Sequence, residues 1–139
     1  MENNNEIKSK KIEFNISTSY LDDLVDKIDK KDLSAVDSLL AKLHPSDIAE
    51  VISNLPEKKR FELIALENFK INPHVIVELT DELQKDILEK ISSDKIVKIV
   101  NSLESDNALQ IIENLTDEKK DRVLTKIPIE DKNLFEETL

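Results

Sequence analysis

The chain has 139 residues and a formal net charge of −10, from 30 acidic and 20 basic side chains. It contains neither cysteine nor glycine. This excludes disulfides, catalytic thiols and cysteine-ligated zinc, and it disfavours enzymes whose phosphate loops or nucleophile turns depend on glycine. The acidic balance argues against a nucleic-acid partner, because phosphate contacts need a basic surface. No apolar run approaches the about 20 residues of a membrane-spanning helix, so we expect no direct insertion of this segment into a bilayer.

Residues 1–18 are rich in Asn, Ser and Lys, and we predict that they form a flexible N-terminal tail. Within them Ile12, Phe14 and Ile16 alternate with polar residues, so an extended segment docked on the domain is the alternative. Helical spacing follows, with apolar residues three and four apart at Leu21, Leu24, Val25 and Ile28. We therefore place the folded domain at residues 19–139.

From Asp32 onward, apolar residues recur with a period of twelve. The units begin at residues 32, 44, 56, 68, 80, 92, 104, 116 and 128. The ninth place of the unit is apolar except at Glu136, and the twelfth is apolar except at Glu67. The eighth place is apolar in every unit, at Leu39, Val51, Leu63, Val75, Ile87, Ile99, Ile111, Val123 and Phe135. Places eight, nine and twelve lie on one helix face, so each unit predicts a short amphipathic helix.

The unit starts carry residues that favour the beginning of a helix, as in Thr80-Asp81-Glu82 and Thr116-Asp117-Glu118. Their oxygens can accept hydrogen bonds from the free N–H groups of a first turn, and their charge suits the positive end of the helix dipole. Helices this short are unstable alone and must stack on one another. We therefore predict an all-α fold, a superhelix (solenoid) of about ten short helices. An irregular helical bundle is the alternative.

One stretch of the repeat carries a more specific motif. Residues 43–57, LHPSDIAEVISNLPE, resemble the signature of the N-terminal domain of MgtE magnesium transporters, which runs L-H-P-x-D-I-A-E, two apolar residues, then x-x-L-P. Residues 103–115 are similar to the family's L-x-x-D-D-A-A-D-L-L-x-x-L segment, and residues 32–36 resemble its second helix, with Lys31 where glycine is usual. The resemblance covers residues 20–139 and implies that the superhelix is right-handed.

The resemblance implies a cytoplasmic regulatory domain that senses intracellular Mg²⁺. In the family, this domain is followed by CBS domains and a transmembrane pore, so we expect an excised domain or a truncated protein, soluble when isolated. The implied partners are the CBS and transmembrane domains of the same parent chain, which forms a homodimer at the bacterial inner membrane. High Mg²⁺ bridges the acidic N domain to the CBS domains and closes the pore, and low Mg²⁺ releases it, which is ligand-biased two-state gating.

The resemblance also carries over five candidate Mg²⁺ ligands. Asp106, Asn107 and Gln110 fall on the acidic positions of the D-D-A-A-D segment. His74 falls on another acidic position of the family, with Glu78 one turn further on. Because three of these side chains have lost the charge, we expect Mg²⁺ to bind weakly, or not at all, in the isolated domain. The alternative role for Asp106 is a helix N-cap.

A surplus of carboxylates supports a cation-binding role. Residues 104–139 carry ten acidic and five basic groups. Mg²⁺ prefers oxygen ligands and is often held by only one or two carboxylates, so a site split between domains is chemically reasonable. Two other charged runs are interpreted as solvated surface, namely the aspartates of residues 22–29 and Lys58-Lys59-Arg60.

The alternative function is a non-catalytic helical-repeat module for protein–protein interaction, similar to the short-helix superhelices of FliG flagellar motor proteins. The motor proteins carry a Glu-His-Pro-Gln-type patch and a Gly-Gly hinge, and this sequence contains neither. No serine, histidine and aspartate occur in a nucleophile arrangement with a supporting glycine loop, so we predict no catalytic residue and no enzyme.

Overall fold

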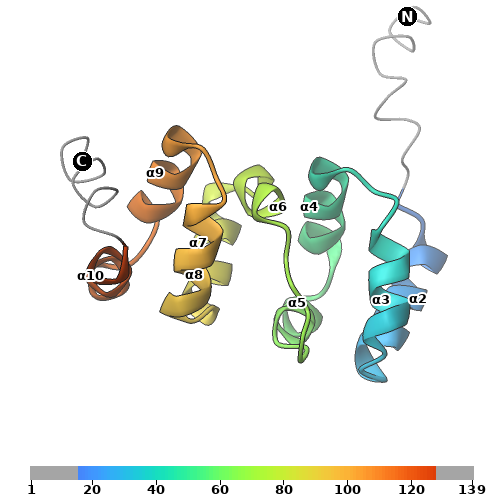
Figure 1. The fold of residues 1–139 in the computed structure, drawn as a ribbon. Helices are drawn as coiled ribbons and strands as arrows, with labels where there is room; N and C mark the ends of the chain where they lie inside the picture. Colours follow the sequence, from blue (N-terminus) through green and yellow to red (C-terminus); the bar gives the residue numbers. More distant parts are fainter. Residues whose placement is uncertain (1–15, 128–139) are drawn as a thin grey trace, which may run out of the picture.

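The computed structural model of the chain describes residues 16–127, which form nine α-helices and no β-strand. Figure 1 shows these helices joined by short loops, with α2 and α3 at one end of the molecule and α10 at the other. The prediction of an all-α fold is confirmed, whereas the superhelix and its right hand stay predictions. In chain order the helices are α2 (Thr18–Asp29), α3 (Leu33–Leu40), α4 (Pro45–Asn54), α5 (Glu57–Ile64), α6 (Pro73–Glu78), α7 (Asp81–Lys90), α8 (Ser93–Asn101), α9 (Ser105–Glu113) and α10 (Asp117–Lys126).

Most of the predicted tail, residues 1–18, lies outside the described residues, as does the last repeat unit, residues 128–139. Helix α2 begins at Thr18, and the hydroxyl of Ser17 caps it by accepting a 3.1 Å hydrogen bond from a first-turn N–H. Ile16 packs, half-buried, against the core. The boundary between tail and domain therefore stays a prediction.

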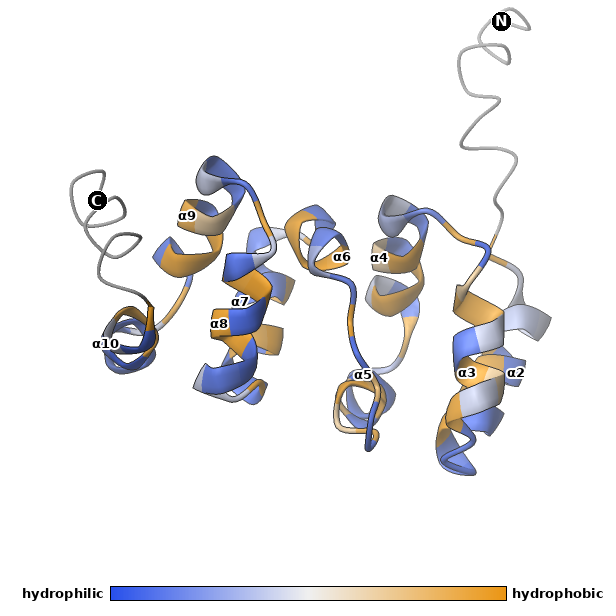
Figure 2. Cartoon of the chain, viewed as in Figure 1, coloured by the Kyte–Doolittle hydropathy of each residue, from blue (hydrophilic) through white to orange (hydrophobic). Residues whose placement is uncertain are grey.

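The twelve-residue period sets where the helices begin. Eight units fall within residues 16–127, and in seven of them the helix begins at the second place of the unit. All described side chains at the eighth and ninth places are buried, except the half-buried Leu39 and Leu124. They belong to one continuous apolar core, and Figure 2 shows the hydrophobic and hydrophilic faces that this spacing creates on each helix. Burying each such side chain contributes about 1.5–3 kcal/mol.

Helices that are two apart in sequence pack on each other. Helix α4 packs on α6, α5 on α7, and α8 on α10, while α2 with α3 and α8 with α9 pack as sequence neighbours. These contacts bury apolar faces of helices that, at two to three turns, would be unstable in isolation.

The unit that begins at residue 68 is the exception. Its helix, α6, begins at Pro73, four residues later than the period places it, and is six residues long against eight to ten in the other units. Residues 65–72 form a loop instead. Asn68 lies in the left-handed region with φ 68°, which asparagine tolerates, and the N–H of Phe69 closes the turn on the carbonyl oxygen of Leu66 at 3.1 Å.

The predicted helix starts at Thr80, Ser92 and Thr116 are confirmed, since each hydroxyl accepts a hydrogen bond from the N–H three residues on. The prediction that Asp106 is an N-cap is wrong. Because the helix begins at the second place of its unit, the N-cap of α9 is Glu104, whose side chain makes no capping bond, and Asp106 lies inside the first turn.

Lys31 stands where the resemblance leads us to expect glycine, and its backbone conformation favours glycine. The residue ends α2 with φ 56°. Its N–H donates to the carbonyl oxygen of Ile28, and the N–H of Asp32 donates to that of Lys27, both at 3.0 Å. This is the Schellman pattern, whose C′ residue is left-handed and usually glycine. The Asp32 side chain then caps α3 by accepting a 3.1 Å bond from the N–H of Ala35.

Candidate functional site

Asp106 is exposed in the first turn of α9. Its Oδ1 accepts a 2.9 Å hydrogen bond from the N–H of Asn107, and its other carboxylate oxygen has no partner among residues 16–127. Gln110 lies one turn on, on the same helix face as Asp106, and both Asn107 and Gln110 are half-buried. These three residues can present oxygen atoms to a cation. The positive end of the α9 dipole lies at the same place and opposes cation binding.

His74 and Glu78 occupy α6. His74 is the second residue of the helix and Glu78 the last, so the two lie one turn apart on one face. Both are exposed. The backbone N–H of His74 donates a 2.9 Å hydrogen bond to Oδ1 of Asn72, which caps the helix. The imidazole and the Glu78 carboxylate make no hydrogen bond to other described residues.

The fold leaves these candidates as two partial ligand sets, one on α6 and one on α9. Within residues 16–127, no group of three or more His, Asp or Glu side chains could together hold a metal ion. A cation bound at either set would therefore need water or ligands from another domain to complete its coordination. The ligand roles stay predictions.

Three of the four carboxylates of α2 form ion pairs within the domain, whereas those of α9 form none with a described residue. Lys30 and Lys27 hydrogen-bond Asp26 and hold the pKa of that carboxyl below its ordinary value. Lys27 also pairs with Asp23 at 3.2 Å, and Lys59 pairs with Asp29. In contrast, no carboxylate of residues 104–113 forms an ion pair with a described residue. The carboxylates of α9 are thus less compensated than those of α2, where only Asp22 forms no ion pair with a described residue.

The prediction that Lys58-Lys59-Arg60 is a solvated face is wrong for two of its residues. Lys59 bridges Asp29 and Glu62. Arg60 donates at 3.1 Å from Nε to the carbonyl oxygen of Ile52 and from Nη2 to that of Leu55. The last turn of α4 has unpaired carbonyl groups, and a guanidinium there satisfies them.

Comparison with known families decides what kind of domain this is. The family model of the MgtE intracellular N domain matches residues 43–139, well over half of the chain. The chain belongs to the MgtE intracellular N domain family. This is a family of regulatory transporter domains and not of enzymes. No curated protein and no solved structure matches the chain.

The His-Pro motif of this MgtE N domain serves helix α4. His44 is the N-cap in extended backbone, and Pro45 takes the first helical position, where its missing N–H forfeits no bond. Asp47 adds a negative charge to the first turn, and Ala49 is buried in the core. The motif that carries the resemblance thus begins helix α4 and contributes to its packing, and the candidate ligands lie elsewhere.

None of the helices of the MgtE N domain within residues 16–127 has the length and apolar composition of a membrane span.

The MgtE N domain also has a concave surface that the sequence did not predict. A cavity of about 550 Å³ lies between α5, the loop of residues 65–72 and α8. The only sequence signal for it is the interruption of the period at Glu67, just before the loop that forms one wall.

Proposed function

We propose that this chain is the N-terminal cytoplasmic domain of an MgtE-type magnesium transporter and that it senses intracellular Mg²⁺ for a pore in the same parent chain. The family match over residues 43–139 carries this proposal. The parent is a homodimer in the bacterial inner membrane, this domain lies on its cytoplasmic side, and the CBS domains of the parent are the direct partner of this domain.

The mechanism follows from the charge of the two partners. A domain with a net charge of −10 is repelled by an acidic partner, and Mg²⁺ ions between them remove that repulsion. Mg²⁺ therefore binds more tightly to the docked arrangement than to the separated one, and that differential affinity shifts the equilibrium toward docking. Docking closes the pore when intracellular Mg²⁺ is high.

Asp106 is the residue of this domain that contributes most to the bridging ion. It is exposed, it forms no ion pair within residues 16–127, and one of its carboxylate oxygens is uncommitted. Mg²⁺ keeps several waters and needs only one or two carboxylates, so Asp106 with one partner carboxylate suffices. Asn107 and Gln110 supply neutral oxygens on the same side of α9. His74 and Glu78 form a second, weaker contact on α6.

A relaxation experiment with Mn²⁺ tests this site. Mn²⁺ takes the same oxygen ligands as Mg²⁺ and broadens the NMR signals of nearby nuclei. Substoichiometric Mn²⁺ should broaden the amide signals of residues 104–110 before others, and millimolar Mg²⁺ should reverse this. Asp106→Asn should abolish the effect. In a longer chain that includes the CBS domains, the same signals should respond at lower Mg²⁺.

Asp22→Asn is the matched control, because Asp22 is an exposed aspartate of α2 with no ion pair among the described residues. It should leave the broadening at α9 unchanged. Broadening that is centred on α2, or that survives Asp106→Asn, would show that the ion binds elsewhere. An equal and negligible response of the short and long chains would remove the sensor function.

A further inference from the structure

The cavity lies beside α6, at the break in the repeat. Every other described unit begins its helix at the second place, whereas residues 69–72 stay in a loop and α6 has only six residues. The cavity between α5 and α8 is lined on one side by this loop. In a protein built from stacked short helices, the walls of this hollow resemble a surface on which a further helix could pack.

The inner surface of the hollow is apolar. Phe61 and Ile64 of α5, Phe69 and Ile71 of the loop, and Ile91 and Ile99 at α8 all line it. Phe61, Phe69 and Ile71 are only partly buried. Exposed aromatic and branched side chains in a concave surface are typical of protein binding sites.

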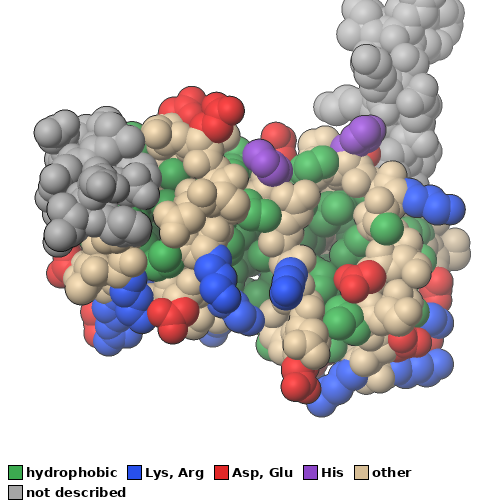
Figure 3. Space-filling view, in the orientation of Figure 1, with side chains coloured by type: hydrophobic (Ala, Val, Ile, Leu, Met, Phe, Trp, Pro, Cys, Tyr) green, Lys and Arg blue, Asp and Glu red, His purple; other side chains and the backbone are tan. Residues whose placement is uncertain are grey.

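The rim of the hollow is basic, although the chain as a whole is acidic. Lys70 stands on the loop side, and Lys90, Lys95 and Lys98 stand on the side of α7 and α8. No acidic residue is among the lining residues. Figure 3 shows Lys or Arg side chains beside exposed hydrophobic ones in the middle of this face. Four lysines around an apolar surface favour a ligand that is negatively charged at its edges and apolar at its centre.

The rim lysines are among the basic residues that form no ion pair within residues 16–127. Lys27, Lys30, Lys59 and Lys126 each pair with a carboxylate within the domain. Within residues 16–127, none of the four rim lysines forms an ion pair. Lys90 instead lies 5.2 Å from the ring centroid of Phe61, a cation–π contact. Lys98 interacts electrostatically with Asp94 without forming an ion pair, so most of the positive charge of the rim is available to a partner.

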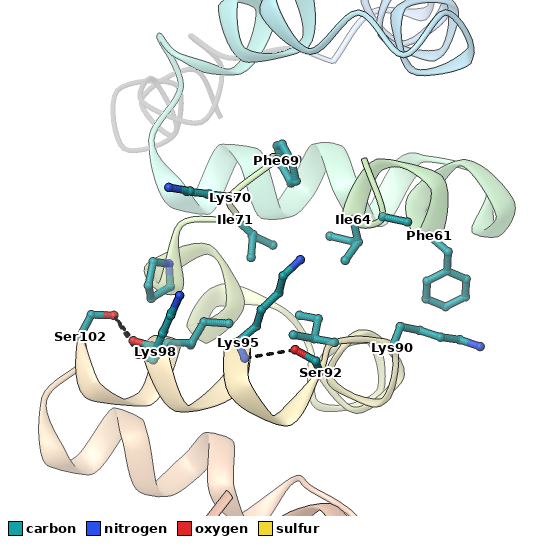
Figure 4. Close-up of a pocket in the computed structure, with 14 residues that line it drawn as sticks. Phe61, Ile64, Phe69, Lys70, Ile71, Lys90, Ser92, Lys95, Lys98 and Ser102 are labelled. Carbon is teal, nitrogen blue, oxygen red and sulfur yellow. Dashed lines mark hydrogen bonds between the residues drawn. The ribbon is translucent and has the colours of Figure 1, made fainter. Parts of the chain in front are cut away.

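The hollow follows α8 along its length. Ser92, Lys95, Ile99 and Ser102 line it, and their spacing of three or four residues places them on one face of the helix. That face is about 15 Å long at 1.5 Å per residue. Figure 4 shows Lys95 and Lys98 extending from α8 toward the opposite wall, which carries Ile64 and Ile71. A groove of this shape suits an elongated occupant such as a helix of two to three turns.

We propose that this groove, bounded by α5, residues 65–72 and α8, binds an acidic amphipathic helix of a partner protein. The apolar side chains of that helix cover Phe61, Phe69 and Ile71, and its carboxylates pair with the lysines on both rims. This is helix-in-groove recognition with charge complementarity. It goes beyond the proposed Mg²⁺ sensing, because it involves neither α9 nor a metal ion.

A flat anionic membrane is the less suitable occupant. The domain carries a net charge of −10, so a negative surface of any extent repels most of it. A narrow helix places its carboxylates against the rim alone, and the apolar floor is recessed between the rims where a flat surface reaches it poorly.

Fluorescence anisotropy with a designed peptide tests the proposal on the full chain in EDTA. The probe is a labelled helical peptide of about 14 residues, with leucines on one face and glutamates on both flanks. Its control has glutamine in place of glutamate. The chain should bind the acidic probe, binding should weaken as salt is raised, and the glutamine probe should bind about ten-fold more weakly.

The double variant Lys95→Glu/Lys98→Glu should weaken binding of the acidic probe by about ten-fold or more. Lys42→Glu/Lys85→Glu is the matched control, since both residues are exposed, neither lines the groove, and the change in net charge is the same. It should bind the probe within about two-fold of the unchanged chain. Circular dichroism confirms that both variants keep their helices.

Equal weakening in the two double variants would overturn the proposal, because it would reflect net charge alone. Failure to bind the probe, with binding to vesicles that contain phosphatidylglycerol, would assign the groove to a membrane. Self-association that Lys95→Glu/Lys98→Glu abolishes would assign it to a second copy. If the probe does not bind and the same variant shifts the NMR signals of residues 128–139, the chain's own C-terminal segment is the occupant.

Discussion

Nε2 of Gln84 in α7 donates a 2.8 Å hydrogen bond to the carbonyl oxygen of Ile76 in α6, and both residues are fully buried. The carbonyl oxygen of the same side chain accepts a bond from Nδ2 of Asn114, which follows α9. Gln84 occupies the fifth place of its unit, where four other units carry an apolar residue. The side-chain amide of Gln84 thus links α7 to α6 and to the end of α9, with both its donor and its acceptor hydrogen-bonded.

Replacing Gln84 should destabilise the domain through the partner that it leaves behind. Gln84→Leu keeps most of the volume but removes the amide bond to the carbonyl oxygen of Ile76, which keeps only the 3.2 Å bond from the N–H of Leu79, and it leaves Nδ2 of Asn114 without this acceptor. The loss of these bonds should cost about 0.5–1.5 kcal/mol. Gln84→Glu should cost more at neutral pH, because a carboxylate cannot donate to that oxygen and its charge is buried. Urea unfolding followed by circular dichroism measures both.

Gln110→Leu is the control for this series. Gln110 is half-buried, and its side chain makes no hydrogen bond to other described residues, so its loss should change the free energy of unfolding by less than about 0.5 kcal/mol. If Gln84→Leu is as stable as the unchanged chain, the bond to Ile76 does not stabilise the fold.

Lys119 should stabilise the end of α7 from a neighbouring helix. Its Nζ donates to the carbonyl oxygens of Leu88, Glu89 and Ile91, at 3.1, 2.8 and 2.7 Å. Lys119→Met keeps the aliphatic stem and removes these charged bonds, so it should lower the free energy of unfolding by about 2 kcal/mol. Lys120→Met is the control, with an expected loss below about 0.5 kcal/mol. Equal losses would mean that the carbonyl contacts contribute nothing specific.

The sequence predicted the helices well because local spacing decides them. Apolar residues at the eighth, ninth and twelfth places fix which face is buried, and the caps at Thr80, Ser92 and Thr116 fix where helices begin. The predicted N-cap of α9 was wrong by two residues, because the cap is Glu104 and Asp106 lies inside the first turn. The polar residue Glu67 indicated that the repeat is interrupted here. The late start of α6 could not be predicted from the period, because it depends on the left-handed conformation of Asn68.

The functional surface was less predictable for a physical reason. The candidate ligands Asp106 and His74 could be named from the resemblance alone, because each is assigned from a segment within one helix, and their roles stay predictions. The groove needs side chains from α5, the loop of residues 65–72 and α8, and its lysines are ordinary surface residues until the fold gathers them. Likewise, only the structure shows that Arg60 binds the end of α4.

Lys31→Gly should stabilise the domain. A non-glycine residue in the left-handed region costs about 1–2 kcal/mol, and Lys31 has φ 56°. Glycine removes this cost but gains more entropy in the unfolded chain, so we expect a net gain of about 0.5–1 kcal/mol. Lys30→Gly is the matched control, because Lys30 has φ −83° in the right-handed region and glycine there should destabilise. A loss of stability in both variants would contradict the strain at Lys31.

The thermal stability of the domain should fall in acid, partly through two aspartates. Hydrogen bonding from Lys126 lowers the pKa of Asp94, and hydrogen bonding from Lys30 and Lys27 lowers that of Asp26. A carboxyl whose pKa is lower in the folded state stabilises the fold above its unfolded pKa of about 3.9 and loses this contribution as the pH falls through the folded pKa. The melting temperature should thus vary little between about pH 5 and pH 7 and decline below about pH 4.

Removing the pair of Lys126 and Asp94 should make this acid decline shallower. Asp94→Asn no longer titrates, and Lys126→Met returns the pKa of Asp94 toward its ordinary value, so both variants lose part of the pH dependence. The effect should be small, because both side chains are exposed and solvent screens the pair. It should also shrink in high salt. Differential scanning calorimetry from pH 3 to pH 7 measures the slope, and an unchanged slope in both variants would show that the pair does not form in solution.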